Sequence, residues 1–323
     1  MASLGVLIPT RNSMRRLPEH LKQAATWIDL AAEVVVVDSL SEDGTVEYLR
    51  ERLQHCRVRI LSRPPGLYES WNYGVQNMES EHTYISTVGD TITREGLRHL
   101  IAVAEAQQAE VVMSKPRFVR FPTGAEARIR WPIDDILVQR KAVFPLRLRP
   151  LEMVIYAAAH PDGGLLGSSA SNLYRTVALK RRPFPTIFGV AGDGAWAVMH
   201  AHELSWSVTP SVISTFMLHP TDATEGEQHR SRGMRLDRVL ASTVAAAVSE
   251  GRLARDDFAR LQLERLFAAG SRWMDAKEAF DQARAARFPW SLNPASWLLR
   301  MRRNRCRSEL DRIKRLALQA FGD

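Results

Sequence analysis

Two apolar segments near the N-terminus constrain the fold of this chain more than any other feature. The first is Gly5-Val-Leu-Ile-Pro-Thr-Arg-Asn12, and the second is Val34-Val-Val-Val-Asp-Ser-Leu-Ser-Glu-Asp-Gly-Thr45. Each begins as an apolar run and ends abruptly in polar and turn-forming residues, which is typical of parallel strands buried on both faces. In open α/β sheets, ligands bind just beyond the carboxyl ends of such strands. The pair therefore predicts a nucleotide-binding sheet edge, with Asp38 where the second strand stops.

Strand and helix patterns alternate through residues 1–115. We expect strands at residues 4–8, 33–38, 58–61, 83–87 and 110–113. Helical patterns lie between them, at residues 15–30, 42–54, 68–78 and 93–108. Ser41 or Asp43 is the expected N-cap of the second helix. Repeated β-α units predict an α/β fold with a mostly parallel sheet flanked by helices.

Composition favours a protein of the reducing cytoplasm. The chain has 323 residues, of which 45% are hydrophobic, so it can bury one large core or two smaller ones. No run reaches the roughly 18–20 apolar residues of a membrane span. The N-terminus lacks the basic start and cleavage site of a secretory signal. Two cysteines are too few for a disulfide framework or a cysteine-rich metal site.

The basic charge is confined to the last third of the chain. Residues 231–323 hold 19 Lys and Arg against 11 Asp and Glu, which accounts for the whole net charge of +8. This segment reads as helical, and its end places Trp297, Leu298 and Leu299 beside an arginine cluster. Three interpretations remain open: an interfacial helix on anionic lipid, a helical cap or self-association contact, and nucleic-acid binding. The third ranks last because no nucleic-acid-binding motif accompanies the charge.

Two aspartates are candidates for chemistry at the predicted sheet edge. Asp38 could accept hydrogen bonds from a nucleobase or a ribose, and Asp90, in Thr87-Val-Gly-Asp90, follows the fourth strand at the same edge. No glycine-rich phosphate loop follows a strand, so the diphosphate must be held in another way. A divalent cation, Mg²⁺ or Mn²⁺, is the usual alternative, with Asp90 as a ligand. Each aspartate could equally be an ordinary cap or turn residue.

Four motifs, in order, resemble the donor half of family 2 inverting glycosyltransferases, which have the GT-A fold. They are Ile8-Pro-Thr-Arg-Asn12, Val36-Val-Asp-Ser-Leu-Ser-Glu-Asp-Gly-Thr45, Gly66-Leu-Tyr-Glu-Ser-Trp-Asn-Tyr-Gly74 and Thr87-Val-Gly-Asp90. The resemblance implies a GT-A domain over residues 1–225 and a basic helical extension over 226–323. It also implies a set of nucleotide-sugar-binding residues: Pro9, Thr10, Arg11, Asn12, Asp38, Ser39, Asn72 and Gly89.

The resemblance extends into the acceptor half. Tyr174-Arg175 is followed by Phe188-Gly-Val-Ala-Gly-Asp-Gly-Ala-Trp196, whose acidic residue serves as the general base in the family. The matching position is Asp193, which would take the proton from the attacking acceptor hydroxyl. Asp193 could also be the N-cap of a helix at 194–203. His219 matches the C-terminal histidine that, in many GT-A enzymes, completes the metal site or touches the diphosphate.

The expected function is transfer of a sugar from a nucleotide diphosphate sugar, a UDP-sugar being favoured, to an acceptor hydroxyl with inversion. The resemblance implies a saccharide or lipid-linked acceptor and a role in bacterial surface polysaccharide or glycolipid synthesis. It places the protein in the cytoplasm, with peripheral contact at the inner face of the plasma membrane. The motifs also depart from the family: Ser39 replaces a second acidic residue, Thr87-Val88 replace the usual polar pair, and Tyr73 replaces a basic residue. A catalytically silent nucleotide-binding or scaffold protein of the same fold is the alternative.

Overall fold

Parallel pairing of the two N-terminal strands organises the first half of the structure. The computed structural model describes residues 3–54, 57–129, 132–161, 165–166, 168–218, 238–239, 241–242, 245, 257–285 and 294–320. Within them, β1 (Leu4–Thr10) and β2 (Glu33–Asp38) lie side by side, with Thr10 paired to Asp38 at their carboxyl ends. All six residues of β2 are buried, as expected for an interior strand of a parallel sheet.

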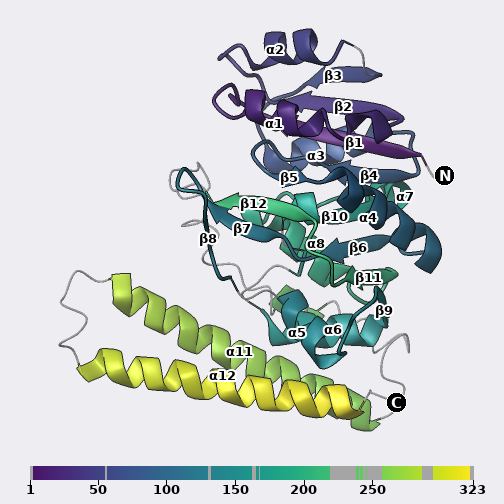
Figure 1. Cartoon of the computed structure of the whole chain (residues 1–323). Helices are drawn as coiled ribbons and strands as arrows, with labels where there is room; N and C mark the ends of the chain where they lie inside the picture. Colours follow the sequence, from purple (N-terminus) through teal and green to yellow (C-terminus); the bar gives the residue numbers. More distant parts are fainter. Residues whose placement is uncertain are drawn as a thin grey trace. The chain divides into compact units, whose positions relative to one another are not determined.

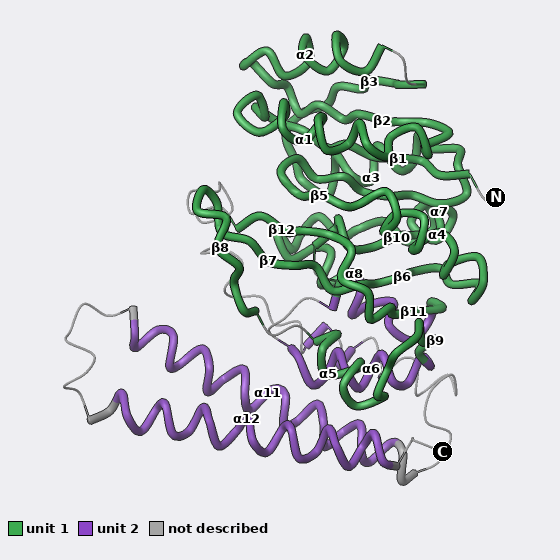
Figure 2. Tube along the Cα trace, in the orientation of Figure 1, with its two compact units in different colours: residues 1–148, 166–196, 204–233 green, residues 149–165, 197–203, 234–323 purple. Residues whose placement is uncertain are grey.

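The chain divides into two compact units (Figure 2). Unit 1 comprises residues 1–148, 166–196 and 204–233, and unit 2 comprises residues 149–165, 197–203 and 234–323. Unit 2 therefore combines the C-terminal part of the chain with two short segments from the preceding part. The division at residue 225 into a catalytic domain and a helical extension stays a prediction.

Eight strands form the large sheet of unit 1, in the order β3-β2-β1-β4-β10-β6-β11-β9 (Figure 1). Besides β1 and β2 they are β3 (Val58–Ser62), β4 (His82–Ile85), β6 (Val111–Ser114), β9 (Leu146–Leu148), β10 (Asn172–Arg175) and β11 (Trp206–Thr209). β10 is antiparallel to both β4 and β6, β9 is antiparallel to β11, and the other neighbours are parallel. The predicted mostly parallel sheet is confirmed. Because β10 runs the other way, its first residues lie at the edge where the parallel strands end.

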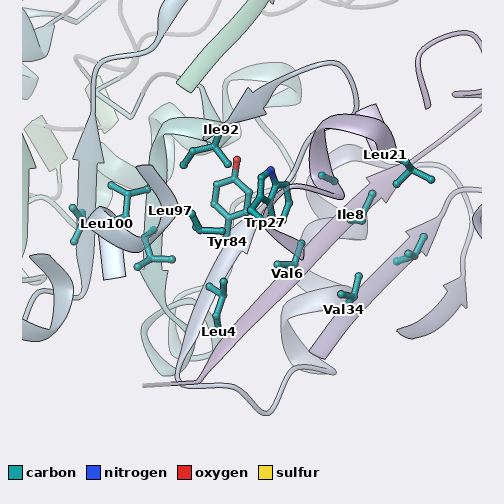
Figure 3. Close-up of a cluster of buried hydrophobic side chains, with 14 of the residues drawn as sticks. Leu4, Val6, Ile8, Leu21, Trp27, Val34, Tyr84, Ile92, Leu97 and Leu100 are labelled. Atoms are coloured by element: carbon teal, nitrogen blue, oxygen red, sulfur yellow. The ribbon is translucent and has the colours of Figure 1, made fainter. Parts of the chain in front are cut away.

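Alternate residues of the central strands face two different layers of helices. On one face, Val6, Val34 and Tyr84 belong to a core cluster with α1 (Leu17–Ala24), α2 (Thr45–Arg52) and α4 (Arg94–Gln107) (Figure 3). In this cluster, Trp27 meets the Tyr84 ring edge to face, with ring centroids 5.6 Å apart. The opposite face carries α3 (Leu67–Gln76), which contacts β1 and β2.

A smaller sheet of four strands completes the framework of unit 1. Its order is β5-β12-β7-β8, formed by β5 (Thr91–Ile92), β12 (Ser214–Leu218), β7 (Arg117–Arg120) and β8 (Ala125–Glu126). β12 is parallel to β7 and antiparallel to β5. Further regular elements of this unit include η1 (Ile28–Leu30), α5 (Pro132–Gln139), η2 (Ser169–Ser171), α7 (Thr176–Arg181) and η3 (Gly189–Ala191). Since β5 follows Asp90 directly, the small sheet joins the large one at the predicted site.

Unit 2 is built on a pair of long antiparallel helices. α11 (Asp257–Ala285) and α12 (Pro294–Ala320) lie along one another and pack on α6 (Pro150–Ala159). Two arginines of α12 stack on aromatic rings of α11: Arg303 lies 4.1 Å from the Phe280 ring centroid and Arg307 lies 5.2 Å from that of Trp273. No helix in the described ranges is long and apolar enough to cross a membrane.

The structure corrects the predicted boundaries of two helices. The pattern at residues 15–30 is not one helix: α1 ends at Ala24, and the 3₁₀ turn η1 follows at Ile28–Leu30. The N-cap of α2 is Gly44, in the left-handed region at φ 85°, and neither Ser41 nor Asp43. The Asp43 carboxylate still accepts a hydrogen bond from the Thr45 N–H at 3.2 Å, and it also accepts one from the Met14 N–H at 3.0 Å.

The close approach of α3 to the sheet generates a stability prediction. A Cβ at Gly74 would lie 2.3 Å from Leu7 Cδ1 and 3.0 Å from Val37 Cγ2. We expect Gly74→Ala to lower the free energy of unfolding by about 1–3 kcal/mol, because the core has no room for an added methyl. Urea denaturation measures the change. In a Leu7→Ala background the same substitution should cost less, because the nearest clashing atom is gone. Stabilisation by Gly74→Ala, as in an exposed helix, would contradict this packing.

Candidate active site

The loops after β1 and β2 are tied together by side-chain hydrogen bonds. The buried Asp38 carboxylate accepts from the Ser41 N–H at 2.9 Å and from the Ser41 hydroxyl at 2.6 Å. The same hydroxyl accepts from the Asn12 N–H at 2.8 Å, and Asn12 Oδ1 accepts from the Glu42 N–H at 2.9 Å. Asn12 adopts a left-handed conformation at φ 45°, which asparagine tolerates better than most residues. Asp38 and Asn12 thereby give this edge a fixed shape.

The structure brings six of the predicted donor-binding residues to this edge, since each lies at the end of β1 or β2. They are Pro9, Thr10, Arg11, Asn12, Asp38 and Ser39. Thr10 Oγ1 is buried and makes no hydrogen bond within the described residues. Arg11 is exposed. The Ser39 hydroxyl lies 2.9 Å from that of Ser70, which in turn accepts from Arg63 Nη1 at 3.1 Å. The positively charged Arg63 guanidinium therefore lies at the same edge of the sheet.

Asp90 connects the two sheets of unit 1. Its side chain is buried, and its carboxylate accepts from the Ser168 hydroxyl at 2.9 Å and from the Met217 N–H of β12 at 3.1 Å. The preceding residue, Gly89, has φ 109°, where a side chain would be strained. The predicted residues Gly89 and Asp90 thus form a tight turn. Ser168 joins them because it lies just before β10, whose start is at this edge.

His20 of α1 is a site residue that the sequence did not single out. It is buried, with Nδ1 3.2 Å from the Asp90 carbonyl oxygen and 3.4 Å from the Gly89 nitrogen, and with Nε2 3.1 Å from the Ser86 hydroxyl. Burial lowers the pKa of His20 to about 4, and the Asp90 carbonyl opposes this only in part. A polar side chain on the buried face of a helix, beside Leu17 and Leu21, was the available signal.

The metal prediction rests on residues that the structure describes only in part. His219 lies outside the described residues, so its place at the site stays a prediction. Within the described ranges, no group of three or more His, Cys, Asp and Glu side chains could hold a metal ion. Asp90 is the carboxylate at the metal motif, and both of its oxygens accept hydrogen bonds. This donor set suits only a cation that takes most of its ligands from phosphate oxygens and water, as Mg²⁺ does.

Asp193 lies in the first turn of α8 (Gly192–Met199), half-buried against α3. It is not the N-cap of a helix that starts at 194, because η3 runs directly into α8 and the helix begins earlier. The Gly194 N–H donates to Asp193 Oδ1 at 2.7 Å, and the Tyr68 hydroxyl donates to the Val190 carbonyl oxygen at 3.1 Å. Burial raises the pKa of Asp193, and the nearby Tyr68 hydroxyl and the Gly194 N–H oppose the rise only in part. A carboxylate with a raised pKa is a stronger base once it is ionised.

A cluster of aromatic rings includes Tyr68, which lies beside Asp193, and Trp196, which follows Asp193 in α8. Its rings meet at centroid distances between 5.0 and 6.1 Å, and its members are Tyr68, Trp71, Tyr174, Phe184, Trp196 and Trp206. Tyr68 and Trp71 are buried, so they are core residues and not an open surface for a ligand ring. Gly192 is required here, because a Cβ would lie 2.5 Å from the Tyr68 ring and 2.6 Å from the Pro185 carbonyl oxygen.

Asn72 fixes the segment that carries Phe184. Its Nδ2 donates to the Phe184 carbonyl oxygen at 2.8 Å, and its Oδ1 accepts from the Phe184 N–H at 2.8 Å. The Asn72 side-chain amide therefore pairs with both the N–H and the carbonyl oxygen of Phe184. The structure gives Asn72 a positioning role for the aromatic cluster, and its predicted contact with the donor stays a prediction.

The arrangement defines a class of protein. The sheet is mostly parallel, with Asp38 and Asp90 at one edge and the antiparallel strand β10 beside β4. A further carboxylate, Asp193, lies at the start of the later helix α8. This is the GT-A fold of glycosyltransferases. Residues 5–154 match the model of Glycosyl transferase family 2. This part of the chain is therefore a family 2 glycosyltransferase domain, as the motifs predicted, and the domain indicates a glycosyltransferase.

Solved structures with the same fold include those of TarS from S. aureus. Residues 1–349 of TarS in complex with UDP-GlcNAc match with a TM-score of 0.56 and 16% identity, over 98% of this chain and 92% of that one. The complex with UDP gives 0.53 and 16%, over 99% and 92%. TarS in a longer form gives 0.58 and 17%, and the match spans 55% of its length. No curated protein sequence matches the chain.

The buried His20 generates a prediction about acid stability. A histidine with a folded pKa of about 4 and an unfolded value near 6.5 takes up its proton more readily in the unfolded state. Stability should therefore fall as the pH drops from 6.5 to 4, and His20 should account for about 3 kcal/mol of that loss. Urea unfolding of wild type and His20→Asn at several pH values isolates this contribution. Equal slopes for the two proteins between pH 6.5 and 4 would contradict the assigned burial of the imidazole.

Proposed function

We propose that this glycosyltransferase transfers a sugar from a UDP-sugar to an acceptor hydroxyl with inversion at the anomeric carbon. The observation that carries the proposal is Asp193, a carboxylate whose pKa is raised by burial and which an aromatic cluster holds at the start of α8. The bound ligands of two TarS structures, UDP and UDP-GlcNAc, support a uridine nucleotide donor for this fold.

Asp193 acts as the general base in this proposal. The acceptor oxygen attacks the anomeric carbon, its proton passes to the Asp193 carboxylate, and the bond to the nucleoside diphosphate breaks. A single displacement of this kind inverts the anomeric configuration. The Gly194 N–H keeps the carboxylate oriented before the proton arrives.

The donor lies at the carboxyl ends of β1 and β2. Asp38 and Ser39 recognise the nucleoside, and Pro9, Thr10, Arg11 and Asn12 line the same edge. Thr10 Oγ1, buried without a hydrogen bond in the described part of the chain, is available to a ligand group. Arg63, held by Ser70, supplies positive charge for the diphosphate where the family has a basic residue in place of Tyr73.

Asp90 would hold Mg²⁺ or Mn²⁺, with Gly89 shaping the turn and His219 as a further ligand. Such a cation would supply positive charge to stabilise the leaving diphosphate. His20 contacts the backbone of Gly89 and Asp90, so it positions this turn.

The acceptor in this proposal is a saccharide or a lipid-linked saccharide of a bacterial surface polymer or glycolipid. The reaction takes place at the cytoplasmic face of the plasma membrane, which the protein contacts peripherally through unit 2. The competing interpretation is a silent nucleotide-binding scaffold, favoured by the single carboxylate at the metal motif.

Replacement of Asp193 tests the proposed base. We expect Asp193→Asn to lower kcat about 10³-fold, because the amide cannot accept the acceptor proton. The melting temperature should not fall, because burial of the ionised carboxylate disfavours the folded state at neutral pH. Turnover of UDP-sugars is measured with Mn²⁺ and with a chelator, and the anomeric configuration of the product is read by NMR.

Asp29→Asn is the matched control, because Asp29 is an exposed carboxylate whose partner is Arg94 of α4. It should keep full turnover. Equal turnover in Asp193→Asn and wild type would remove Asp193 as base. Donor binding by thermal shift without any turnover in wild type would instead support the scaffold.

A further inference from the structure

One face of α12 in unit 2 exposes large apolar side chains to solvent. Trp297 is 62% exposed, Leu298 61% and Met301 50%. The opposite face, with Leu310, Ile313 and Ala317, is buried. Positions 297, 298 and 301 fall within one third of the helix circumference at 100° per residue. The exposure of these three side chains is therefore a property of one helix face, which we call the α12 face.

The α12 face continues as a basic surface. On the same side of the helix, at 100° per residue, the exposed residues from Met301 onward include Arg302, Arg305, Arg312 and Arg315. Within the described residues none of these four arginines pairs with a carboxylate. The two acidic residues of α12 lie beside this surface and are engaged elsewhere: Glu309 pairs with Arg272 at 2.8 Å and Asp311 with Arg307 at 3.1 Å. The face thus carries positive charge without compensation.

We propose that the α12 face binds the surface of an anionic lipid bilayer, with the helix lying in the membrane interface. The inference deepens the proposed function, since it assigns residues and lipid chemistry to the peripheral contact. Trp297, Leu298 and Met301 enter the boundary between headgroups and acyl chains. The four arginines bind lipid phosphates, their aliphatic stems lying along the apolar layer.

The combination of positive charge and exposed apolar side chains favours an anionic bilayer over other binding partners. A second copy of the chain would bring one α12 face against another, and this face offers no carboxylate for the arginines. A soluble polyanion would neutralise the arginines but leave Trp297, Leu298 and Met301 in water. An anionic bilayer satisfies both halves of the face at once, because tryptophan favours the interface and anionic headgroups attract arginine.

Vesicle co-sedimentation of the full chain tests the proposal. Vesicles of phosphatidylcholine with about 30% phosphatidylglycerol should pellet the protein, and pure phosphatidylcholine vesicles should not. Binding should weaken as salt rises, since screening reduces the attraction between arginines and lipid phosphates. The assay contains no sugar nucleotide, so its outcome is independent of whether the protein turns over a UDP-sugar.

Two variants of the α12 face separate its apolar and basic parts. Arg302→Gln/Arg305→Gln should lower the partition coefficient about 30-fold, at about fivefold per arginine. Trp297→Ala/Leu298→Ala should lower it at least tenfold. The matched controls are Arg260→Gln and Leu261→Ala, which remove an exposed arginine and an exposed leucine from α11. Both should bind as wild type, and unchanged helix content by circular dichroism shows that the variants are folded.

Three outcomes would overturn the proposal. Equal binding to anionic and neutral vesicles, or equal loss in the α11 controls, would show that the α12 face is not the contact. A dimer that Trp297→Ala/Leu298→Ala dissociates, without vesicle binding, would make a second copy the occupant. Retention on a polyphosphate matrix with no vesicle binding would indicate a soluble polyanion.

Discussion

The raised pKa of Asp193 depends on burial of its carboxylate beside Tyr68. Tyr68 can take this position because Gly192 leaves room for its ring, and because α3 lies directly on the sheet through Gly74. Asn72, on the same helix, clamps the backbone of Phe184 and so fixes another ring of the cluster. The pKa of Asp193 follows from that packing, since desolvation is the largest cause of its rise.

The carboxylates of the candidate site differ in how far hydrogen bonds offset their burial. At the β1–β2 edge, the Asp38 carboxylate receives two hydrogen bonds from Ser41, and these compensate its burial. Asp90 is similarly compensated by Ser168 and Met217. Asp193 is the exception, because its hydrogen bonds do not offset desolvation and its charged form is disfavoured. A carboxylate whose pKa is raised by burial is a candidate for proton transfer.

The sequence predicted the parts of this structure that depend on local patterns. Strands β1 and β2 could be read from apolar runs, and Asp38, Asp90 and Asp193 from motifs that follow strands or begin a helix. Helix α2 begins later in the chain than predicted, with Gly44 as its N-cap. Asp43, a predicted N-cap, instead accepts a hydrogen bond from the Met14 N–H in a different loop. His20, Ser168 and the clamp on Phe184 could not be predicted, because each is a contact between segments far apart in the chain. Such contacts are fixed by tertiary packing, which local patterns do not encode.

The pH dependence of kcat/KM tests the role of Asp193 most directly. The acid limb should report the raised pKa of Asp193 and therefore lie above the usual range of an aspartate. In Tyr68→Phe the limb should move to higher pH, because the Tyr68 hydroxyl lowers this pKa. A limb near pH 4 that stays in place in Tyr68→Phe would show that another group takes the proton.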